Sequence, residues 1–407
     1  MNRPHFSRLL IRLTPIIAFL AFPYLGQCQA VRPDQIIKYC TLQAQKTLNE
    51  MPQGPRNLPR SIEKTQKQWR YTDYRDWCSG FWPGILWYLF EDTKDTKWRT
   101  AAEQYTAELA PLVSTRGFDH DLGFMIYNSY GNGYRLTGNA AYKKIILAAA
   151  VSLATLYNPK VGTILSWPGM VKQQNWPHNT IIDNMMNLEL LFWAAKNGGD
   201  HRLYDIAVRH ANTTMQNHFR PDFSAYHVVV YDTLSGKKIK GVTHQGFADN
   251  SMWARGQSWA IYGYTMCYRE TGKPEFLKLA QQIADIYLKK LPADGIPFWD
   301  FDDPSIPLAP KDASAGCITS SALLELSTLV KNKAKAAYYR KQAERMLAAL
   351  SHDPYLAKDQ NTSFLLHSTG HQPKGSEIDA SIIYADYYFL EATVRLQKLR
   401  SNLPLIK

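Results

Sequence analysis

The segment Tyr134-Arg135-Leu136-Thr137-Gly138-Asn139-Ala140-Ala141-Tyr142 decides the fold, because similar segments recur along the chain. The others begin at Leu89, Ala195, Tyr268 and, in a weaker form, Val330. Each is typical of a helix end, a Gly or Asn cap, a short turn and a new helix. One aromatic residue follows each turn: Trp98, Tyr142, Tyr204, Phe276 and Tyr338. The repeat therefore predicts five helical hairpins.

The helices after these turns carry an apolar stripe, as in Phe276, Leu279, Ala280 and Ile283. Two further helical segments, 34–50 and 384–399, have no partner nearby in the sequence. If they pack together, they make a sixth hairpin and close a ring. We expect an all-α fold, an (α/α)6 barrel in one domain spanning 31–407. An open solenoid is the alternative, but it usually has more uniform repeats and polar end caps.

The first thirty residues have the pattern of a secretory signal. Arg3, Arg8 and Arg12 precede an apolar stretch at 13–25, and Cys28-Gln29-Ala30 suits cleavage after Ala30. We expect export to the periplasm, with a lipid anchor on Cys28 as the less favoured alternative. No later stretch is long and apolar enough for a membrane helix. Without the three arginines, the formal charge falls from +12 to +9.

The composition argues for a folded protein with a large core. The chain has 407 residues, of which 45% are hydrophobic and 20% charged, and this excludes a disordered protein. Cys40, Cys78, Cys267 and Cys317 are far apart, so the sequence predicts buried thiols and neither disulfides nor a metal site. We expect no cofactor.

Long loops rich in Trp, His, Gly, Pro and Asp separate the hairpins. They span 71–83, 115–123, 163–183, 227–259, 296–318 and 363–382. In an up-down ring these loops all lie at one end, where they would form a pocket. The run 228–231, the turn at Ser235-Gly236 and the run 237–242 predict a small β-hairpin on that rim.

Two loop carboxylates are candidates for acid and base chemistry. Asp183 stands among apolar residues, which disfavour its charged form and raise its pKa, as a general acid requires. Asp121 holds the equivalent place in the preceding hairpin, so both carboxylates are expected to converge. Asp119, beside it, is expected to be a helix cap or to face solvent.

Aromatic and basic residues in the same loops could bind a sugar. Trp77 and Phe81 suit either a stacking platform or core packing, and the sequence leaves both open. In the fourth loop, His227, His244 and Gln245 precede Arg255, whose fork of donors suits a carboxylate, and Trp259 follows one helical turn later.

With these residues, the chain resembles glycoside hydrolase family 88, the unsaturated glucuronyl hydrolases, over essentially its whole length after residue 30. The matching segments are His120-Asp121-Leu122-Gly123-Phe124, Asp183-Asn184-Met185-Met186-Asn187, His227, His244-Gln245-Gly246, Trp253-Ala254-Arg255-Gly256-Gln257-Ser258-Trp259 and Tyr384-Ala385-Asp386-Tyr387-Tyr388. The family fold is an (α/α)6 barrel, in agreement with the hairpins.

The resemblance implies hydration of a 4,5-unsaturated uronic acid at the nonreducing end of lyase-generated glycosaminoglycan fragments. Asp183 would be the acid and base, and Asp121 would position the sugar. The implied substrate-binding residues are Trp77, Phe81, His120, Trp167, His227, His244, Gln245, Arg255 and Trp259. Ser368 and Lys374, with Thr369 and Ser376, lie in the loop where some members meet a sulfate, although an ordinary polar loop is equally compatible.

Two other functions stay open at this point. One is an unsaturated rhamnogalacturonyl hydrolase of family 105, which shares the fold and the chemistry but acts on pectin fragments. The other is a non-catalytic sugar-binding protein, against which the presence of both aspartates argues. The expected partner is an anionic unsaturated oligosaccharide, with no nucleic acid and no membrane after signal removal, and the expected state is a monomer or dimer. The basic excess would attract such an anion.

Overall fold

The computed structural model describes residue 1 and residues 31–52, 54, 57–114 and 119–405. The expected signal sequence, with Cys28 and the cleavage point at Ala30, lies outside the described residues. So do residues 115–118 at the start of the second predicted loop.

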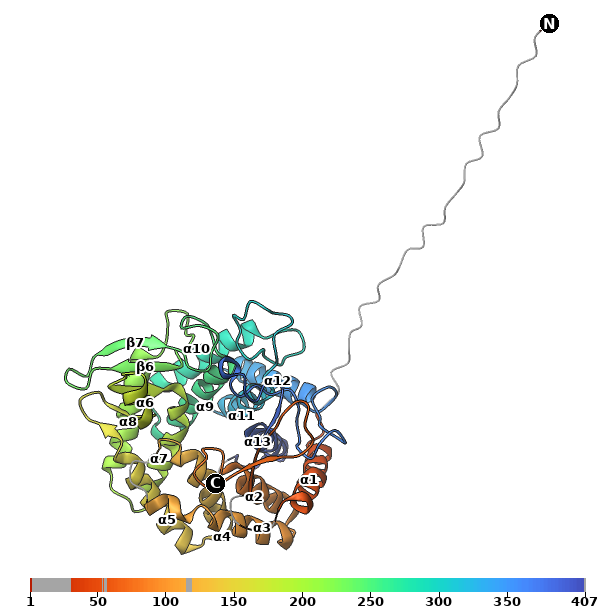
Figure 1. Ribbon diagram of the computed structural model, residues 1–407, viewed down its shortest axis with the longest axis horizontal. Coiled ribbons are helices and arrows are strands. Elements are labelled where there is room, and N and C mark those ends of the chain that lie inside the picture. Colours follow the sequence, from red (N-terminus) through yellow and green to blue (C-terminus); the bar gives the residue numbers. More distant parts are fainter. Residues whose placement is uncertain (2–30, 53, 55–56, 115–118, 406–407) are drawn as a thin grey trace.

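Six inner helical elements form a closed ring (Figure 1). Each packs against the next, and the last packs against the first. In chain order they are α2 (Phe81–Thr93), η2 with α4 (Gly123–Gly131 and Asn132–Thr137), η3 with α7 (Ile182–Asn187 and Leu188–Lys196), α9 (Ala254–Thr271), α11 (Ala313–Leu329) and α13 (Ile383–Arg400). Of these, η2 is a π-helix and η3 a 3₁₀-helix.

Each inner element has one outer helix as its main packing partner. The outer helices are α3 (Thr96–Ala107), α5 (Ala140–Ala154), α8 (Arg202–Asn217), α10 (Pro274–Lys290), α12 (Lys333–Leu350) and α1 (Pro33–Glu50). The last of these packs on α13, so the two terminal helices make the sixth hairpin. The predicted (α/α)6 barrel and its closure by distant segments are confirmed.

Side-chain patterning separates the inner helices from the outer ones. Every residue from Ala313 to Leu326 of α11 is buried, and small Ala, Gly and Ser side chains allow the close packing. The outer helix α8 instead buries a stripe at Leu203, Ala207, Ala211 and Thr214. Burial on all sides marks the inner layer, and burial on one side marks the outer layer.

The short turns have the caps that the sequence predicts. Gly138 and Gly272 end their helices with φ of +67° and +69°, the left-handed conformation that glycine adopts without strain. Asn139 then caps α5 by accepting a hydrogen bond from the Ala141 N–H. In the first hairpin Lys94 takes the left-handed position instead.

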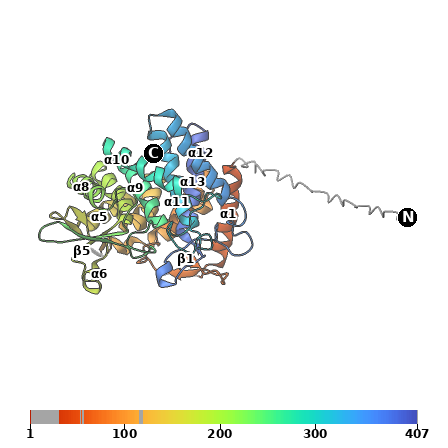
Figure 2. The same cartoon turned by 90° about the horizontal axis from the view of Figure 1, so that it is seen from above.

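The long connections lie at the other end of the ring and carry three small sheets. In Figure 2, β1, β5 and α6 (Pro168–Gln173) lie toward one end and the C-terminus toward the other. The predicted hairpin is confirmed as β6 (Val228–Tyr231) and β7 (Lys238–Val242). The prediction of a hairpin alone was incomplete, because β5 (His178–Ile181) adds a third strand.

Two further sheets were not predicted. One joins β2 (Arg70–Thr72), β1 (Leu58–Ile62) and β8 (Ser381–Ile382), and the other joins β3 (Tyr157–Asn158) and β4 (Thr163–Ile164). Two short 3₁₀ segments, η1 (Ala110–Ser114) and η4 (Gln372–Lys374), complete the described elements. The three-stranded sheet of β1, β2 and β8 ties the first long connection to the last.

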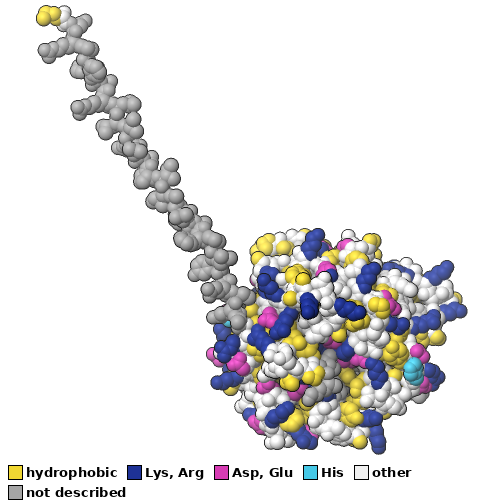
Figure 3. Space-filling model, turned by 180° about the vertical axis from the view of Figure 1, so that it is seen from behind, with side chains coloured by type: hydrophobic (Ala, Val, Ile, Leu, Met, Phe, Trp, Pro, Cys, Tyr) yellow, Lys and Arg dark blue, Asp and Glu magenta, His cyan; other side chains and the backbone are white. Residues whose placement is uncertain are grey.

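The four cysteines within the described residues are buried free thiols, as predicted. Over the same part of the chain, none of the helices combines the length and the apolar character that crossing a membrane requires. On the face shown in Figure 3, Lys and Arg side chains are scattered among acidic and neutral ones and do not gather in one track.

Candidate active site

The ring places the two predicted carboxylates at the starts of neighbouring inner elements. Asp121 lies two residues before the start of η2, and Asp183 is the second residue of η3. These two elements pack against each other. Asp121 is 8% exposed, and the Asp183 side chain is 14% exposed, so both are nearly enclosed but still reach a surface.

A close contact between the two elements fixes Asp121. Gly123 lies so near Asn187 that an added Cβ would stand 2.5 Å from the Asn187 Cα. The Asn187 Nδ2 donates to Asp121 Oδ1 at 3.3 Å, while the Phe124 N–H donates to Asn187 Oδ1 at 3.0 Å. On the other side, Asp119 accepts from the Asp121 N–H at 3.2 Å, the capping role expected of it.

Burial changes the proton affinity of both carboxylates. It raises the pKa of Asp183 to about 6, although the positive charges of Arg255 and His120 oppose the shift. The pKa of Asp121 is raised as well, mainly by burial and further by the charges of Asp119 and Asp183, while His120 lowers it. The rise at Asp183 has the direction and the cause expected from its apolar neighbours.

His120 is held between acidic groups. Its Nε2 lies 3.2 Å from Asp121 Oδ1, and its Nδ1 lies 2.7 Å from both Asp119 Oδ1 and the Ser166 carbonyl oxygen. Burial alone would lower the pKa of His120, but the charges of Asp121 and Asp119 raise it above the usual range. A cationic His120 therefore stabilises the ionised form of Asp121.

His227 is neutral and faces Asp183 with its Nε2. Its Nδ1 accepts hydrogen bonds from the N–H groups of His244 at 3.2 Å and Gln245 at 3.1 Å, so the ring proton belongs on Nε2. That Nε2 lies 3.7 Å from Asp183 Oδ2. Burial lowers the pKa of His227 and keeps it uncharged.

A group of aromatic rings borders the carboxylates. The half-buried Trp167 packs edge-on against His227 at 5.6 Å and His244 at 5.2 Å, and more distantly against His120. Trp77, also half-buried, lies 5.1 Å from Tyr384. These rings offer partly open apolar faces beside acidic groups, an arrangement suited to a sugar.

A pocket of about 390 Å³ adjoins this group. Four predicted substrate contacts line it: Trp77, Gln245, Arg255 and Lys374. Gln245 links the pocket wall to the carboxylates, because its N–H bonds to the same His227 that faces Asp183.

The same pocket has cationic residues that the sequence analysis missed. Arg60 and Arg70 come from β1 and β2 and share the carboxylate of Glu377 at 3.1 and 2.6 Å. Basic residues on two short strands gave no local signal of their place, because the pairing of β1 with β8 brings them to the site. Four cations and two carboxylates leave this pocket positive.

Arg255 is committed largely to the protein itself. It is 2% exposed, and its NH1 donates to Asp312 Oδ2 at 2.7 Å and to the Thr369 carbonyl at 2.5 Å. Its NH2 donates to the Gly370 carbonyl at 2.5 Å. The prediction of a free fork for a substrate carboxylate needs correction: most of the donors clamp α9 to α11 and to the last loop.

Several predicted contacts support the site from behind. Phe81, His120, Trp259 and Ser368 have no exposed surface, and His227 is 3% exposed. For Phe81 the core-packing alternative is correct, because Trp77, Phe124, Tyr384, Tyr387 and Tyr388 surround it. Ser368 is enclosed by backbone pairing with Ala380, so the prediction that it meets a ligand is wrong for this conformation. Lys374 is exposed.

Among the described residues, Asp119, His120 and Asp121 place one ligand atom each within 4.8 Å of one another, close enough for a cation. The His120 Nδ1 is already engaged with the Ser166 carbonyl, and its other nitrogen faces Asp121. Hydrogen bonding and charge pairing therefore account for the cluster, and we assign it to positioning Asp121.

An (α/α)6 ring with a carboxylate pair, aromatic walls and a cationic pocket at its loop end defines a class of carbohydrate-active enzyme. Comparison with known proteins is specific: the chain matches the model of Glycosyl Hydrolase Family 88 over residues 52–399. The chain belongs to this family.

Individual relatives agree. An unsaturated glucuronyl hydrolase of Formosa agariphila is 46% identical over 360 residues, which cover 87% of this chain and 88% of that protein. A crystal structure described as an unsaturated glucuronyl hydrolase specific for heparin has a TM-score of 0.85 and 42% identity, covering 92% and 99% of the two chains.

A mutant of unsaturated glucuronyl hydrolase from Streptococcus agalactiae, complexed with dGlcA-GalNAc6S, has a TM-score of 0.77 and 27% identity, covering 89% and 91%. The family resemblance seen in the sequence is thus confirmed. The predicted class of enzyme, a glycoside hydrolase of the unsaturated glucuronyl hydrolase type, is confirmed with it.

Proposed function

We propose that the chain hydrates the C4=C5 double bond of a 4,5-unsaturated uronic acid at the nonreducing end of a glycosaminoglycan fragment. Asp183 donates its proton to C4, and positive charge develops at C5 and the ring oxygen. Water then adds its oxygen to C5 and returns a proton to Asp183. The resulting hemiketal opens and releases the rest of the saccharide.

One observation carries this assignment: Asp183 is a nearly enclosed carboxyl group with a pKa of about 6. A carboxyl of ordinary pKa would be almost wholly ionised near neutral pH, whereas this one retains a useful acid fraction. His227 is neutral, and its Nε2 lies 3.7 Å from Asp183 Oδ2, so it packs beside the carboxyl group and is not itself an acid. Asp121, next to cationic His120, supplies a second carboxylate for sugar hydroxyls.

The pocket beside the carboxylates suits an anionic substrate. Arg60, Arg70 and Lys374 make its wall positive, and Trp77 offers a ring face. Relatives whose names specify unsaturated chondroitin disaccharides or heparin support a glycosaminoglycan fragment as the substrate class. Within the loop once expected to meet a sulfate, Lys374 is exposed and Ser368 is not, so Lys374 is the better candidate.

The substrate class is tested with lyase-generated disaccharides from chondroitin, hyaluronan, heparin and rhamnogalacturonan. Hydration removes the conjugated uronate, so ultraviolet absorbance falls as turnover proceeds. We expect loss with at least one glycosaminoglycan product. Loss with the rhamnogalacturonan product alone would replace this proposal by the pectin alternative, and no loss with any of them would reject it.

The acid role of Asp183 is tested by Asp183→Asn. This variant keeps the shape of the side chain and removes the transferable proton, so turnover should be abolished while the disaccharide still binds. Asp205→Asn, which makes the same change at an exposed carboxylate on the outer helix α8, serves as the matched control. Turnover retained by Asp183→Asn would remove Asp183 from its role.

We also propose that the chain is exported to the periplasm and works there as a monomer or dimer. The arginines and apolar stretch before residue 31 support export. Cell fractionation with N-terminal sequencing of the mature protein tests this, because cleavage after Ala30 leaves Val31 as the first residue. If the first residue is instead a lipid-modified Cys28, the protein is lipid-anchored and the proposed cleavage after Ala30 is replaced. Light scattering gives the oligomeric state.

A further inference from the structure

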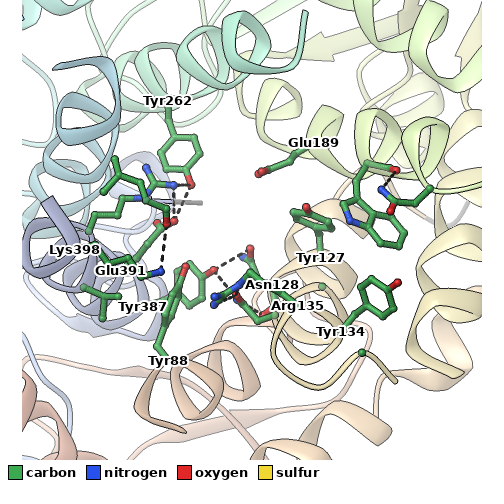
Figure 4. Close-up of a pocket in the computed structure, with 18 residues that line it drawn as sticks. Tyr88, Tyr127, Asn128, Tyr134, Arg135, Glu189, Tyr262, Tyr387, Glu391 and Lys398 are labelled. Atoms are coloured by element: carbon green, nitrogen blue, oxygen red, sulfur yellow. Dashed lines mark hydrogen bonds and ion pairs between the residues drawn. The ribbon is translucent and has the colours of Figure 1, made fainter. Parts of the chain in front are cut away.

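A second cavity, of about 380 Å³, lies at the end of the ring opposite the active-site loops (Figure 4). Gly138 and Asn197, which line it, belong to the short turns at that end. Its other walls come from five of the six inner elements, for example Tyr88 of α2 and Tyr262 of α9. The cavity therefore lies on the axis of the ring and shares no residue with the site described above.

The volume and the walls suit a small ligand. Pockets for small molecules usually fall between roughly 300 and 1,000 Å³. Trp193 packs against Tyr134 at 5.4 Å and Tyr127 at 6.4 Å on one side, and Tyr88 packs against Tyr387 at 5.5 Å on another. In Figure 4, these labelled tyrosines face a common open centre. Aromatic faces on several sides of one polar cavity are suited to a sugar ring.

The cations of this cavity are already paired with protein groups. Arg135 donates to both carboxylate oxygens of Glu91 at 2.7 and 2.6 Å, and Lys398 lies 2.8 Å from the same group. Arg395 pairs with Glu391 at 2.9 Å. Together with Glu189, these carboxylates equal the cations in number, so the cavity has no excess positive charge and does not favour a uronic acid.

Two uncommitted polar groups of the cavity, on Asn128 and Glu189, can still form hydrogen bonds with a ligand. The Asn128 Nδ2 is enclosed and has no hydrogen-bond partner within the described residues. Glu189 reaches the cavity from α7, and one of its carboxylate oxygens accepts a hydrogen bond from Arg269. Burial raises the pKa of Glu189 above the ordinary value of a carboxyl group.

We propose that this axial cavity is a second carbohydrate-binding site, which takes a neutral monosaccharide or disaccharide. Sugar hydroxyls both accept and donate, so they can bond to Asn128 Nδ2 and to Glu189, while the ring stacks on Trp193. The site does not depend on the proposed reaction, because neither carboxylate of the active site contributes to it.

The test uses calorimetric titration of the mature protein with glucose, N-acetylglucosamine and cellobiose, with sodium glucuronate as the anionic probe. Two matched variants separate the sites. Trp193→Ala removes a half-buried indole from the axial cavity, and Trp167→Ala removes a half-buried indole from the active-site rim. Asp183→Asn, which silences turnover, supplies a third background.

We expect a neutral sugar to bind with unchanged affinity to the Trp167→Ala and Asp183→Asn variants. Trp193→Ala should weaken that binding about tenfold, because one aromatic contact is lost. The Trp193→Ala protein should retain the turnover of the parent, which also shows that it is folded. If it does not fold, Tyr134→Ala replaces it, since Tyr134 forms the same wall.

Three outcomes would overturn the proposal. One is the absence of binding by all three neutral sugars at millimolar concentration. Another is binding that Trp167→Ala removes and Trp193→Ala leaves intact, which would place the sugar in the active site. The third is glucuronate binding that is tighter than glucose binding and that Trp193→Ala removes, which would reject the neutral class. None of these results bears on the hydration reaction.

Discussion

The buried pair of Arg255 and Asp312 gives the sharpest prediction about the active-site end of the ring. Asp312 has no exposed surface, and Arg255 NH1 lies 2.7 Å from its Oδ2. Replacement of one partner of a buried pair leaves the other charge without compensation, at a cost of about 3–5 kcal/mol. Arg255→Met should therefore lower the free energy of unfolding by that amount, a large part of the about 5–15 kcal/mol typical of folded proteins.

The measurement is urea-induced unfolding followed by tryptophan fluorescence, on Arg255→Met, Asp312→Asn and the double variant. Each single change removes one charge, and the double change removes both, so the double variant should be no less stable than either single one. A coupling free energy of about 2–3 kcal/mol is expected. Arg255→Lys is the conservative control, because it keeps the charge and loses the forked donors that reach the Thr369 and Gly370 carbonyls.

Effects that add within about 0.5 kcal/mol would refute the reasoning, because they would show that the pair is not coupled. A stable Arg255→Met protein with a much raised KM would return Arg255 to the role first expected from the sequence, direct binding of the substrate. A loss of stability therefore indicates the structural role of Arg255, and a raised KM in a stable protein indicates substrate binding.

Three further predictions follow from the same structure. Because Asp183 must be protonated and burial raises its pKa to about 6, kcat should fall about tenfold per pH unit above that value, and a kcat that rises through pH 6–8 would contradict its acid role. Gly123→Ala would place a methyl group 2.5 Å from Asn187 and displace the amide that holds Asp121, so kcat should fall about 100-fold, whereas unchanged turnover would show that this contact does not position the carboxylate. Burial lowers the pKa of His178 from 6.5 to about 4. As pH falls, the unfolded chain therefore takes up a proton at this residue before the folded chain does. The stability that neutral His178 contributes above pH 6.5 is lost as pH falls toward 4. Between pH 7 and pH 4.5, the free energy of unfolding should decrease by about 2–3 kcal/mol less in His178→Gln than in the parent. Equal decreases in the two proteins would exclude this cause.

The helical hairpins could be predicted because their signals are local. A left-handed Gly such as Gly138 or Gly272, followed by a capped helix with an apolar stripe, is encoded within about twenty residues. The positions of Asp121 and Asp183 followed from the repeat, since equivalent places in successive hairpins meet in a ring. The rise in the Asp183 pKa followed from its apolar neighbours in the sequence.

Contacts between distant segments could not be predicted in the same way. Arg255 is bonded to residues 57, 114 and 115 positions away, and nothing near it in the sequence indicates that its donors are already occupied. Arg60 reaches the pocket through β1, whose partner β8 is more than three hundred residues later. The sequence shows that Phe81 is aromatic, but which face of α2 meets the core depends on the whole ring.

The closure of the ring by α1 and α13, reinforced by β1 and β8, also bears on the order of folding. Five hairpins are made of consecutive segments, so they can form while later parts of the chain are still being synthesised. The sixth must wait, since Tyr39 of α1 bonds to the Phe364 carbonyl across 325 residues. The last loop, which holds the Thr369 and Gly370 carbonyls on Arg255 and supplies Lys374 to the pocket, is set in the same step. The pocket that Lys374 lines is therefore completed only when the ring itself closes.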